Sequence, residues 1–254
     1  MPVQTCPICH GIGWKIVEND GISGAQKCDC RDEEIDRRRR EHSRIPPNYR
    51  DASFDNFSCT HVHQPELQSQ LRDVLVMVRT FAKNLDPKRP GLLLIGRPGS
   101  GKTHLAVAAL KALIDRGYDG MFYNYQELLN KIIASYRPEA GSGEREAYRD
   151  ALEAEVLLLD DLGANRVNEW VQDTITSIIT HRCDNRKPLI ATTNLPDVDA
   201  GDVLGKRSQD GTVDYRRTLS DHIGERARSR LFEMCRVIKL PWVDDYRVRT
   251  RNQR

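Results

Sequence analysis

Two hydrophobic patterns follow one another along the chain. Between residues 65 and 85, apolar side chains recur every three or four positions, which predicts one apolar helical face. Farther on, short apolar runs alternate with helical segments, and runs without polar alternation are typical of strands buried on both faces of a parallel sheet. The predicted strands are 92–95, 121–123, 156–159, 189–192 and 237–240. The predicted helices are 104–116, 126–135, 144–154, 168–183 and 218–234, and together these elements indicate a doubly wound α/β domain.

The first 44 residues follow neither pattern. Residues 1–30 contain four cysteines and several turn residues, but too few large apolar side chains for a core. In the charged stretch 31–44, four consecutive arginines are flanked by acidic residues, which favours a solvated helix face or linker over a nucleic-acid patch. Pro46-Pro47 then stops any helix. We therefore divide the chain into an N-terminal module with its linker (1–44) and an α/β domain (45–254).

Composition narrows the class of protein without naming a partner. The 254 residues contain 39 Lys and Arg against 37 Asp and Glu, so a net charge of +2 does not argue for or against nucleic acid. No apolar run is long enough to span a bilayer, which excludes the membrane class. The first thirty residues lack the apolar segment of a secretory signal, so we expect a cytoplasmic protein.

A phosphate-binding motif lies between the first predicted strand and the following helix. Residues 96–103 read G-x-x-x-x-G-K-T, and the flanking strand and helix are the context that this motif requires. Its backbone amides and the positive end of the helix face an anion, Lys102 reaches the β- and γ-phosphates, and the Thr103 hydroxyl holds Mg²⁺. The alternative is a glycine-rich turn with a chance lysine. The predicted ATP-binding residues are Gly96, Arg97, Pro98, Gly99, Ser100, Gly101, Lys102, Thr103 and His104.

Polar residues end two of the later strands. Asp160 and Asp161 follow the strand 156–159, at the edge where parallel sheets bind ligands. We expect Asp160 to hold Mg²⁺ and Asp161, pointing the other way along the strand end, to orient or deprotonate the attacking water. Asn194 follows the next strand and could reach the γ-phosphate, although asparagine at a strand end is usually turn chemistry.

Arginines four residues apart mark the last predicted helix. Arg226 and Arg230 share one face, which fits an arginine inserted into a neighbouring copy's phosphate site. The alternative is a basic surface helix.

Four cysteines form a second candidate site. Cys6 and Cys9 are C-x-x-C, and Cys28 and Cys30 are C-x-C; four thiolates at such spacing fit a tetrahedral structural zinc. His10 could replace one ligand, and the alternative is two redox pairs or unmetallated thiols. A metal would supply folding energy that so short a segment cannot obtain from a core. We interpret the other three cysteines as buried hydrophobes: Cys59, Cys183 and Cys235.

These segments together resemble the AAA+ ATPases and, within them, the DnaC/DnaI-type replicative helicase loaders. The resemblance covers nearly the whole chain and is carried by residues 45–50, 53–57, 96–106, 159–163, 192–194 and 229–235. It implies that Lys102, Asp161, Asn194 and Arg230 are catalytic, with Asn194 at the sensor-1 position, Arg230 at the arginine-finger position and Arg226 as a second candidate. Most AAA+ proteins carry Glu where this chain has Asp161, so we expect slow hydrolysis. About a dozen residues follow the last strand, and no helical lid is expected.

The resemblance also implies partners. An arginine finger acts between subunits, so the domain should self-associate. A helical insertion lining a single-stranded DNA channel maps near residues 125–138, with Lys131, Tyr136 and Arg137, although an ordinary amphipathic helix explains the same residues. The cysteine module resembles the N-terminal zinc domain that docks the hexameric replicative helicase. The leading hypothesis is thus an ATP-dependent loader of that helicase onto single-stranded DNA in replication initiation.

Three alternatives are weighed against it. An IstB-like transposition helper shares the ATPase core but acts on double-stranded DNA with a transposase, and the cysteine module counts against it. A nucleotide-gated adaptor would bind ATP and hardly hydrolyse it. A small-molecule kinase would need a lid over the phosphates, for which no segment is evident.

Overall fold

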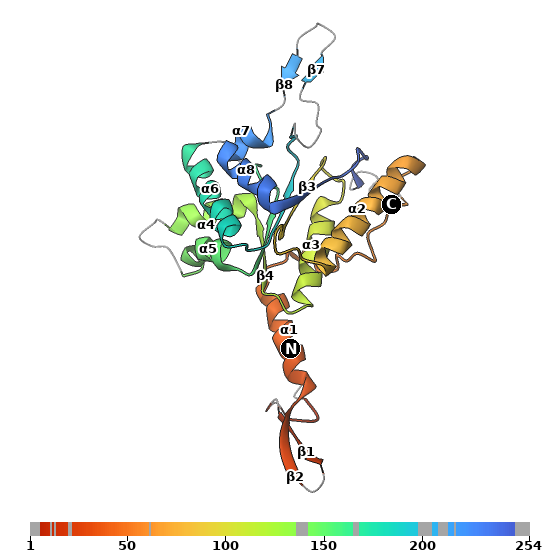
Figure 1. Ribbon diagram of the computed structural model, residues 1–254, viewed down its shortest axis with the longest axis vertical. Helices are drawn as coiled ribbons and strands as arrows, with labels where there is room; N and C mark the ends of the chain where they lie inside the picture. The colour runs from red at the N-terminus through yellow and green to blue at the C-terminus, as the bar shows by residue number, and fades with distance from the viewer. Residues whose placement is uncertain are drawn as a thin grey trace.

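The computed structural model has a compact α/β domain and a slender N-terminal projection (Figure 1). The structure describes residues 6–10, 12, 14–19, 22–60, 62–135, 142–164, 168–197, 205–207, 213–215 and 217–246.

The projection consists of a hairpin and one helix. Strands β1 (Trp14–Asn19) and β2 (Ile22–Lys27) pair in antiparallel register, and helix α1 (Asp29–His42) leads from the hairpin to the domain. The hairpin was not predicted, because its residues show no clear alternation. The arginine run lies on α1, and all four arginines form ion pairs with acidic side chains, as expected for a solvated helix face: Arg37, Arg38, Arg39 and Arg40.

The end of α1 is fixed to the edge of the main sheet. The Ser43 carbonyl accepts a hydrogen bond from the Phe122 amide at 2.8 Å, and Arg44 has a left-handed backbone (φ 56°). The Arg44 guanidinium donates to the Tyr123 hydroxyl and pairs with Asp150 at 3.1 Å. The linker is therefore packed on the domain before the short 3₁₀ helix η1 (Pro47–Tyr49) begins.

The domain is built on the predicted five-stranded parallel sheet. Its strands are β3 (Gly91–Ile95), β4 (Gly120–Asn124), β5 (Val156–Asp160), β6 (Leu189–Thr193) and β9 (Cys235–Lys239), in the order β4-β5-β6-β3-β9. All neighbouring pairs are parallel. This order places β6 between β3 and β5, so the carboxyl ends of all three strands meet at one place.

Helices cover both faces of the sheet (Figure 1). Helices α2 (Pro65–Lys83) and α3 (Lys102–Ile114) pack on one face. The other face is covered by α4 (Tyr125–Ser135), α5 (Ser142–Glu153), α6 (Glu169–Asp184), α7 (Leu219–Ile223) and α8 (Glu225–Met234). Successive strand residues enter opposite clusters, since side chains alternate along a strand: Leu157 and Leu159 join the second group of helices, and Leu158 joins the first.

The α/β domain differs from the predicted elements in two places, apart from shifts of one or two residues at the ends of elements. The helix predicted over 218–234 is two helices, because Gly224 between them has a φ of 84° and its carbonyl starts α8 instead of continuing α7. Strand β9 begins two residues earlier than predicted. A small hairpin, β7 (Gly205–Arg207) with β8 (Val213–Tyr215), was not predicted. Among the described helices, none has both the length and the apolar character needed to cross a bilayer.

Candidate nucleotide and metal sites

The phosphate loop joins the end of β3 to the start of α3. Gly99 and Gly101 have φ values of 74° and 94°, which a side chain would strain, and they curl the backbone around the helix end. The first turn of α3 has no side-chain cap, so its amides remain available to an anion. The loop therefore has the geometry that the sequence motif predicts.

Lys102 is buried at the centre of this loop, with 4% of its surface exposed. Its ammonium group donates to the Arg97 carbonyl at 2.9 Å and to the Asn194 side-chain oxygen at 2.6 Å. The ammonium group therefore lies at the centre of the loop, where it can neutralise the charge of a bound anion. The structure thus brings together Lys102 and Asn194, which are 92 residues apart.

Asp160 lies behind the phosphate loop at the end of β5. Its carboxylate accepts hydrogen bonds from the Thr103 hydroxyl at 2.9 Å and the Thr192 hydroxyl at 2.6 Å. Burial raises the pKa of Asp160, although these hydrogen bonds partly oppose the shift. A buried carboxylate beside a threonine hydroxyl is a ligand set that suits Mg²⁺, so Asp160 and Thr103 can hold this ion.

Asp161 adopts a left-handed backbone conformation immediately after the strand, with a φ of 57°. Its amide donates to the Thr192 hydroxyl at 2.9 Å, and its carboxylate accepts from the Asn194 amide nitrogen at 3.2 Å. The direction of Asp161 is thus set by a turn and by β6, and not by strand alternation as the sequence predicted. One asparagine side chain connects Lys102 to Asp161. Thr192, which holds both aspartates, was quoted in the sequence motif without a role.

A cavity of about 300 Å³ opens beside these residues. Lys102, Thr103, Asp161 and Asn194 line it, as do Pro98, Gly99, Ser100, Gly101 and His104. The other predicted nucleotide residues lie next to it: Gly96 and Asp160 are behind the loop, and the Arg97 guanidinium stacks over Trp242.

The sequence assigned no role to the remaining lining residues. These are Asn48, Tyr49, Asn56, Phe57, Ser58 and Tyr246. Phe57 packs against His104, with ring centroids 5.5 Å apart, and His104 is fixed by a 2.9 Å hydrogen bond to the Ser53 carbonyl. The aromatic side chains Tyr49, Phe57 and Tyr246 give the cavity an apolar side next to its phosphate-binding side. The segments 45–50 and 53–57 were quoted as family motifs, which was the available signal for two of the three.

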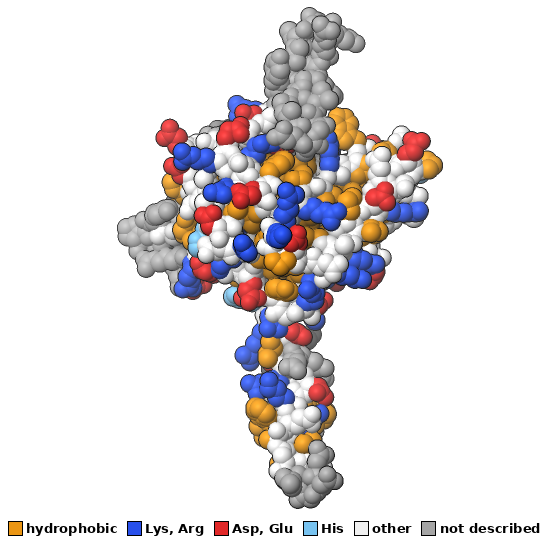
Figure 2. Space-filling model, viewed as in Figure 1, with side chains coloured by type: hydrophobic (Ala, Val, Ile, Leu, Met, Phe, Trp, Pro, Cys, Tyr) orange, Lys and Arg blue, Asp and Glu red, His pale blue; other side chains and the backbone are white. Residues whose placement is uncertain are grey.

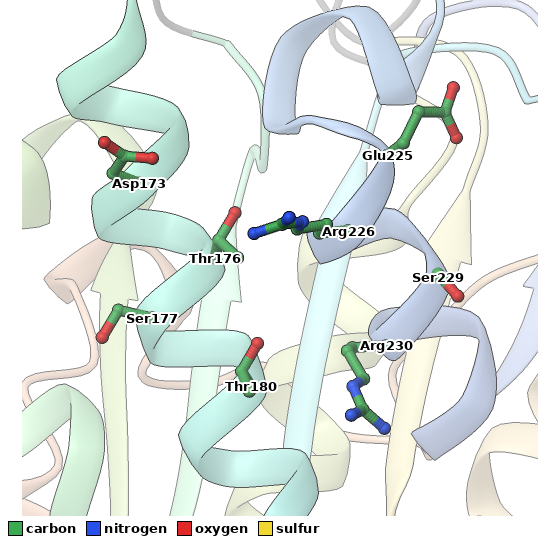
Figure 3. Close-up of a pocket in the computed structure, with 8 residues that line it drawn as sticks. All are labelled: Asp173, Thr176, Ser177, Thr180, Glu225, Arg226, Ser229 and Arg230. Carbon is green, nitrogen blue, oxygen red and sulfur yellow. The ribbon is translucent and has the colours of Figure 1, made fainter.

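The candidate finger arginines lie on α8 and do not line this cavity. Arg226 and Arg230 line a separate, open hollow of about 860 Å³ between α6 and α8. Figure 3 shows Arg226 pointing from α8 toward Thr176 on α6. Arg230 pairs with Glu233 at 2.8 Å. Within the described part of the chain, these arginines are thus available to a partner and not to the chain's own phosphate loop.

One ion pair joins α8 to the loop after β6. Arg228 holds Asp197 with two hydrogen bonds of 2.6 and 2.7 Å, and Asp197 is 1% exposed. Asp197 is three residues from Asn194, so the helix that carries the arginines is fixed to the strand end that carries the asparagine.

The four N-terminal cysteines form one cluster. Their sulfur atoms all lie within 4.8 Å of one another, with Cys6 to Cys28 at 3.8 Å and Cys9 to Cys30 at 3.2 Å. Tetrahedral thiolates at the usual zinc–sulfur bond length are about 3.8 Å apart, so this donor set fits a single metal ion. Backbone amides of Cys9 and Ile8 lower the pKa of the Cys6 thiol, which favours the thiolate form. Among the described residues, His10 is not part of the cluster.

The region 125–138 is described only in part. Helix α4 buries Leu128, Leu129 and Ile132 in the core, and the Lys131 ammonium lies over the Tyr123 ring at 5.5 Å. The other two residues named for DNA contact, Tyr136 and Arg137, lie outside the described residues.

A parallel sheet with a phosphate loop after β3, a buried aspartate ending β5 and a polar residue following β6 defines a P-loop ATPase with an AAA+-like core. The chain belongs to the family of IstB-like ATP-binding proteins, whose profile matches residues 33–213.

Known proteins are similar to this chain in sequence and in fold. The replicative helicase loader DnaC of Escherichia coli (strain K12) is 24% identical over 168 residues, which are 66% of this chain and 65% of DnaC, so the chain spans just under two thirds of this relative. The crystal structure of the DnaC helicase loader is 29% identical, with a TM-score of 0.59, and the match covers 77% of this chain and 100% of that one. The crystal structure of DnaI, at 18% identity and a TM-score of 0.57, shares the fold over 82% of this chain and 99% of that one.

Proposed function

We propose that this protein is an ATP-dependent loader of the replicative DNA helicase onto single-stranded DNA. The observation that carries the proposal is the 29% identity to the DnaC helicase loader along the full length of that structure. Division into an N-terminal helicase-binding module (1–44) and an ATPase domain (45–254) is part of the proposal. The end of α1 at His42 supports this boundary.

The nucleotide site gives each residue a role in hydrolysis. The phosphate loop and Lys102 would hold the triphosphate, and Thr103 with Asp160 would hold Mg²⁺, which would neutralise part of the charge on the phosphates. Asp161 orients the attacking water, and Asn194 senses the γ-phosphate while it contacts both Lys102 and Asp161. Asp161 is shorter than the glutamate found in most AAA+ proteins, and the turn after β5 sets the direction of its side chain. We therefore expect basal ATP turnover to be slow and to rise when a partner binds.

In an assembly of several copies, the arginines on α8 of one copy would add positive charge to the nucleotide site of the next. An arginine from a second copy stabilises the charge that develops on the γ-phosphate, with effects of roughly 10³-fold in other P-loop enzymes. Arg230 is the first candidate and Arg226 the second. At every protein concentration, Arg230→Ala should turn over ATP more slowly than wild type. Mixing Arg230→Ala with Lys102→Ala should restore turnover, because the first variant keeps an intact phosphate loop and the second keeps the arginine. Unchanged turnover for both Arg230→Ala and Arg226→Ala contradicts this role.

The N-terminal module offers a surface for the helicase. Zinc in the four-cysteine cluster would hold the hairpin, while large apolar side chains remain at the surface: Ile8 (61% exposed), Ile12 (74%), Trp14 (44%) and Ile16 (83%). Figure 2 shows hydrophobic side chains on this projection, away from the ATPase domain. Exposed apolar groups on so small a unit are typical of a protein-binding surface. Single-stranded DNA would bind the ATPase domain near α4, with Lys131 as one contact.

Capture of the hexameric replicative helicase tests the proposal. The wild-type chain should retain the helicase in the presence of ATP, Ile16→Asp should lose it, and Val76→Asp, at another exposed apolar site on α2, should keep it. Helicase transfer onto circular single-stranded DNA is then measured for wild type and Asp161→Ala. Failure of every form to bind the helicase contradicts the proposal.

Two outcomes favour the alternatives. Capture of a transposase together with double-stranded DNA favours an IstB-like transposition helper, which the family profile also supports. Full loading by Asp161→Ala, with hydrolysis abolished, favours a nucleotide-gated adaptor.

A further inference from the structure

The segment that follows the last strand turns back over the phosphate loop. Residues 240–245 contain neither helix nor strand, yet they are anchored at two points. The Leu240 amide donates to the Ile95 carbonyl at 2.8 Å, at the start of the phosphate loop. Val243 is 7% exposed and belongs to a small apolar cluster with Cys59, Val62 and Leu71. We call residues 240–246 the C-terminal strap.

Three residues of the strap contact the phosphate loop, at Arg97 and at Gly99. The Trp242 ring lies under the Arg97 guanidinium at 4.8 Å, a cation–π contact. A Cβ atom on Gly99 would lie 2.0 Å from an Asp245 carboxylate oxygen and 2.7 Å from the Asp245 Cα, so only glycine fits against the strap there. The Tyr246 amide donates to the Gly99 carbonyl at 3.3 Å. The conformation of the loop therefore depends partly on the strap.

Tyr246 also lines the nucleotide cavity. It shares the cavity with Lys102 and Thr103 on the phosphate side, and with Tyr49 and Phe57 on the apolar side. Tyr246 is 46% exposed, so part of its surface is accessible to a ligand in the cavity that it lines. A planar base packs favourably against such rings, whichever base it is.

We propose that the C-terminal strap is part of the nucleotide site: Tyr246 contacts the base of the bound nucleotide, and Trp242 and Asp245 hold the phosphate loop. The inference rests on the proposed ATP binding and adds a residue set that the phosphate-loop motif does not include. It assigns the phosphate contact to the loop 96–103 and the base contact to a residue more than 140 positions later in the chain.

Separate ligands distinguish the two contacts in the full-length protein. ADP affinity, measured by calorimetry, should fall about tenfold for Tyr246→Ala and stay within about twofold for Tyr246→Phe, since the ring and not the hydroxyl makes the contact. Pyrophosphate, which has no base, should bind Tyr246→Ala as it binds wild type. Val76→Ala, at an exposed apolar site on α2 that does not line the cavity, is the control.

A phosphate-loop variant keeps the two proposals apart. Lys102→Ala should lose both ADP and pyrophosphate; if it keeps both, the proposed nucleotide site is wrong. If Lys102→Ala loses ADP and Tyr246→Ala binds it as tightly as wild type, the strap proposal alone is overturned.

Trp242 provides a second measurement that does not depend on affinity. The chain has three tryptophans, so Trp14→Phe combined with Trp170→Phe leaves Trp242 as the only one. Its emission should change on saturation with ADP, and adding Arg97→Ala should remove the change. Constant emission at saturating ADP contradicts a strap that takes part in binding.

Discussion

The N-terminal projection and the ATPase domain are stabilised by different means. Of the residues between 6 and 30 whose side chains the structure describes, only Cys9 and Cys28 are buried, and both belong to the cysteine cluster. In the ATPase domain, the central strands are 0–5% exposed and contribute alternate side chains to two large apolar clusters. We therefore expect the projection to need a metal in its cysteine cluster in order to fold, whereas the domain folds through apolar burial.

Metal removal gives the largest expected effect. Structural zinc contributes on the order of 10 kcal/mol to folding of comparably small units, so a chelator or Cys9→Ser should unfold the hairpin β1–β2. The melting temperature of the ATPase domain should change by less than about 2 °C. Hydrogen exchange of the hairpin amides, with calorimetry of the whole chain, measures both effects. Protection that survives chelation contradicts a metal-dependent module, and Cys59→Ser is the matched control.

Arg182 tests how strongly the ATPase domain depends on contacts in its own core. This arginine is fully buried on α6, and its guanidinium donates to five backbone carbonyls, which lie at the end of α5, in the link from α5 to β5 and just before β6. Arg182→Ala leaves these carbonyls without a donor, so the free energy of unfolding should fall by at least about 3 kcal/mol. Denaturant unfolding measures this loss, with exposed Arg149→Ala on α5 as control. The hairpin should keep its exchange protection, and a loss smaller than about 1 kcal/mol contradicts the role given to Arg182.

Substitution of Lys102 tests nucleotide binding while the N-terminal projection and the ATPase domain both stay folded. Its ammonium is a buried charge that would pair with the triphosphate. In other complexes, removing one member of a buried charge pair costs about 2–5 kcal/mol of binding free energy. Lys102→Ala should therefore weaken ATP binding about 100-fold, with little change in the melting temperature. Calorimetric titration measures the affinity, and exposed Lys83→Ala should bind as wild type does. Undiminished affinity contradicts the nucleotide site.

Substitution of Asp160 gives the smallest expected effect, a change in the free energy of unfolding of the nucleotide-free protein. Burial raises the pKa of Asp160, so the folded state holds this proton more tightly than the unfolded state. Its contribution to stability is present at low pH and is lost as the pH rises through the folded pKa. Asp160→Asn should thus stabilise the ligand-free protein at pH 7 by roughly 1 kcal/mol, and the gain should shrink toward pH 4.

The cost of this variant should appear in catalysis. Asp160→Asn should lose Mg²⁺-dependent hydrolysis, because a neutral amide is a poor ligand for Mg²⁺. Thermal unfolding at several pH values measures the stability effect, with exposed Asp73→Asn as control. A destabilised variant at pH 7 contradicts this balance between stability and function.

The predicted strands and the phosphate motif agree with the structure because both depend on local signals. Buried parallel strands need continuous apolar runs, and a curled anion-binding loop needs glycines at fixed spacing. The split between α7 and α8 escaped prediction, since the apolar pattern continues through Gly224 while the backbone turns there. Tyr246 escaped for another reason: no motif marks a residue that reaches the site by folding back.

The sequence by itself determined which segments form the sheet, where the phosphate loop lies and which four cysteines are spaced for a metal. Only the tertiary structure decided that Asn194 joins Lys102 to Asp161, that Thr192 holds both aspartates and that the C-terminal strap lies on Gly99. The physical reason is the strand order. The pattern of apolar residues in the sequence shows whether a strand is buried. Which strands lie next to each other depends on long-range packing of the whole sheet, and that arrangement brings residues that are distant in sequence into one site.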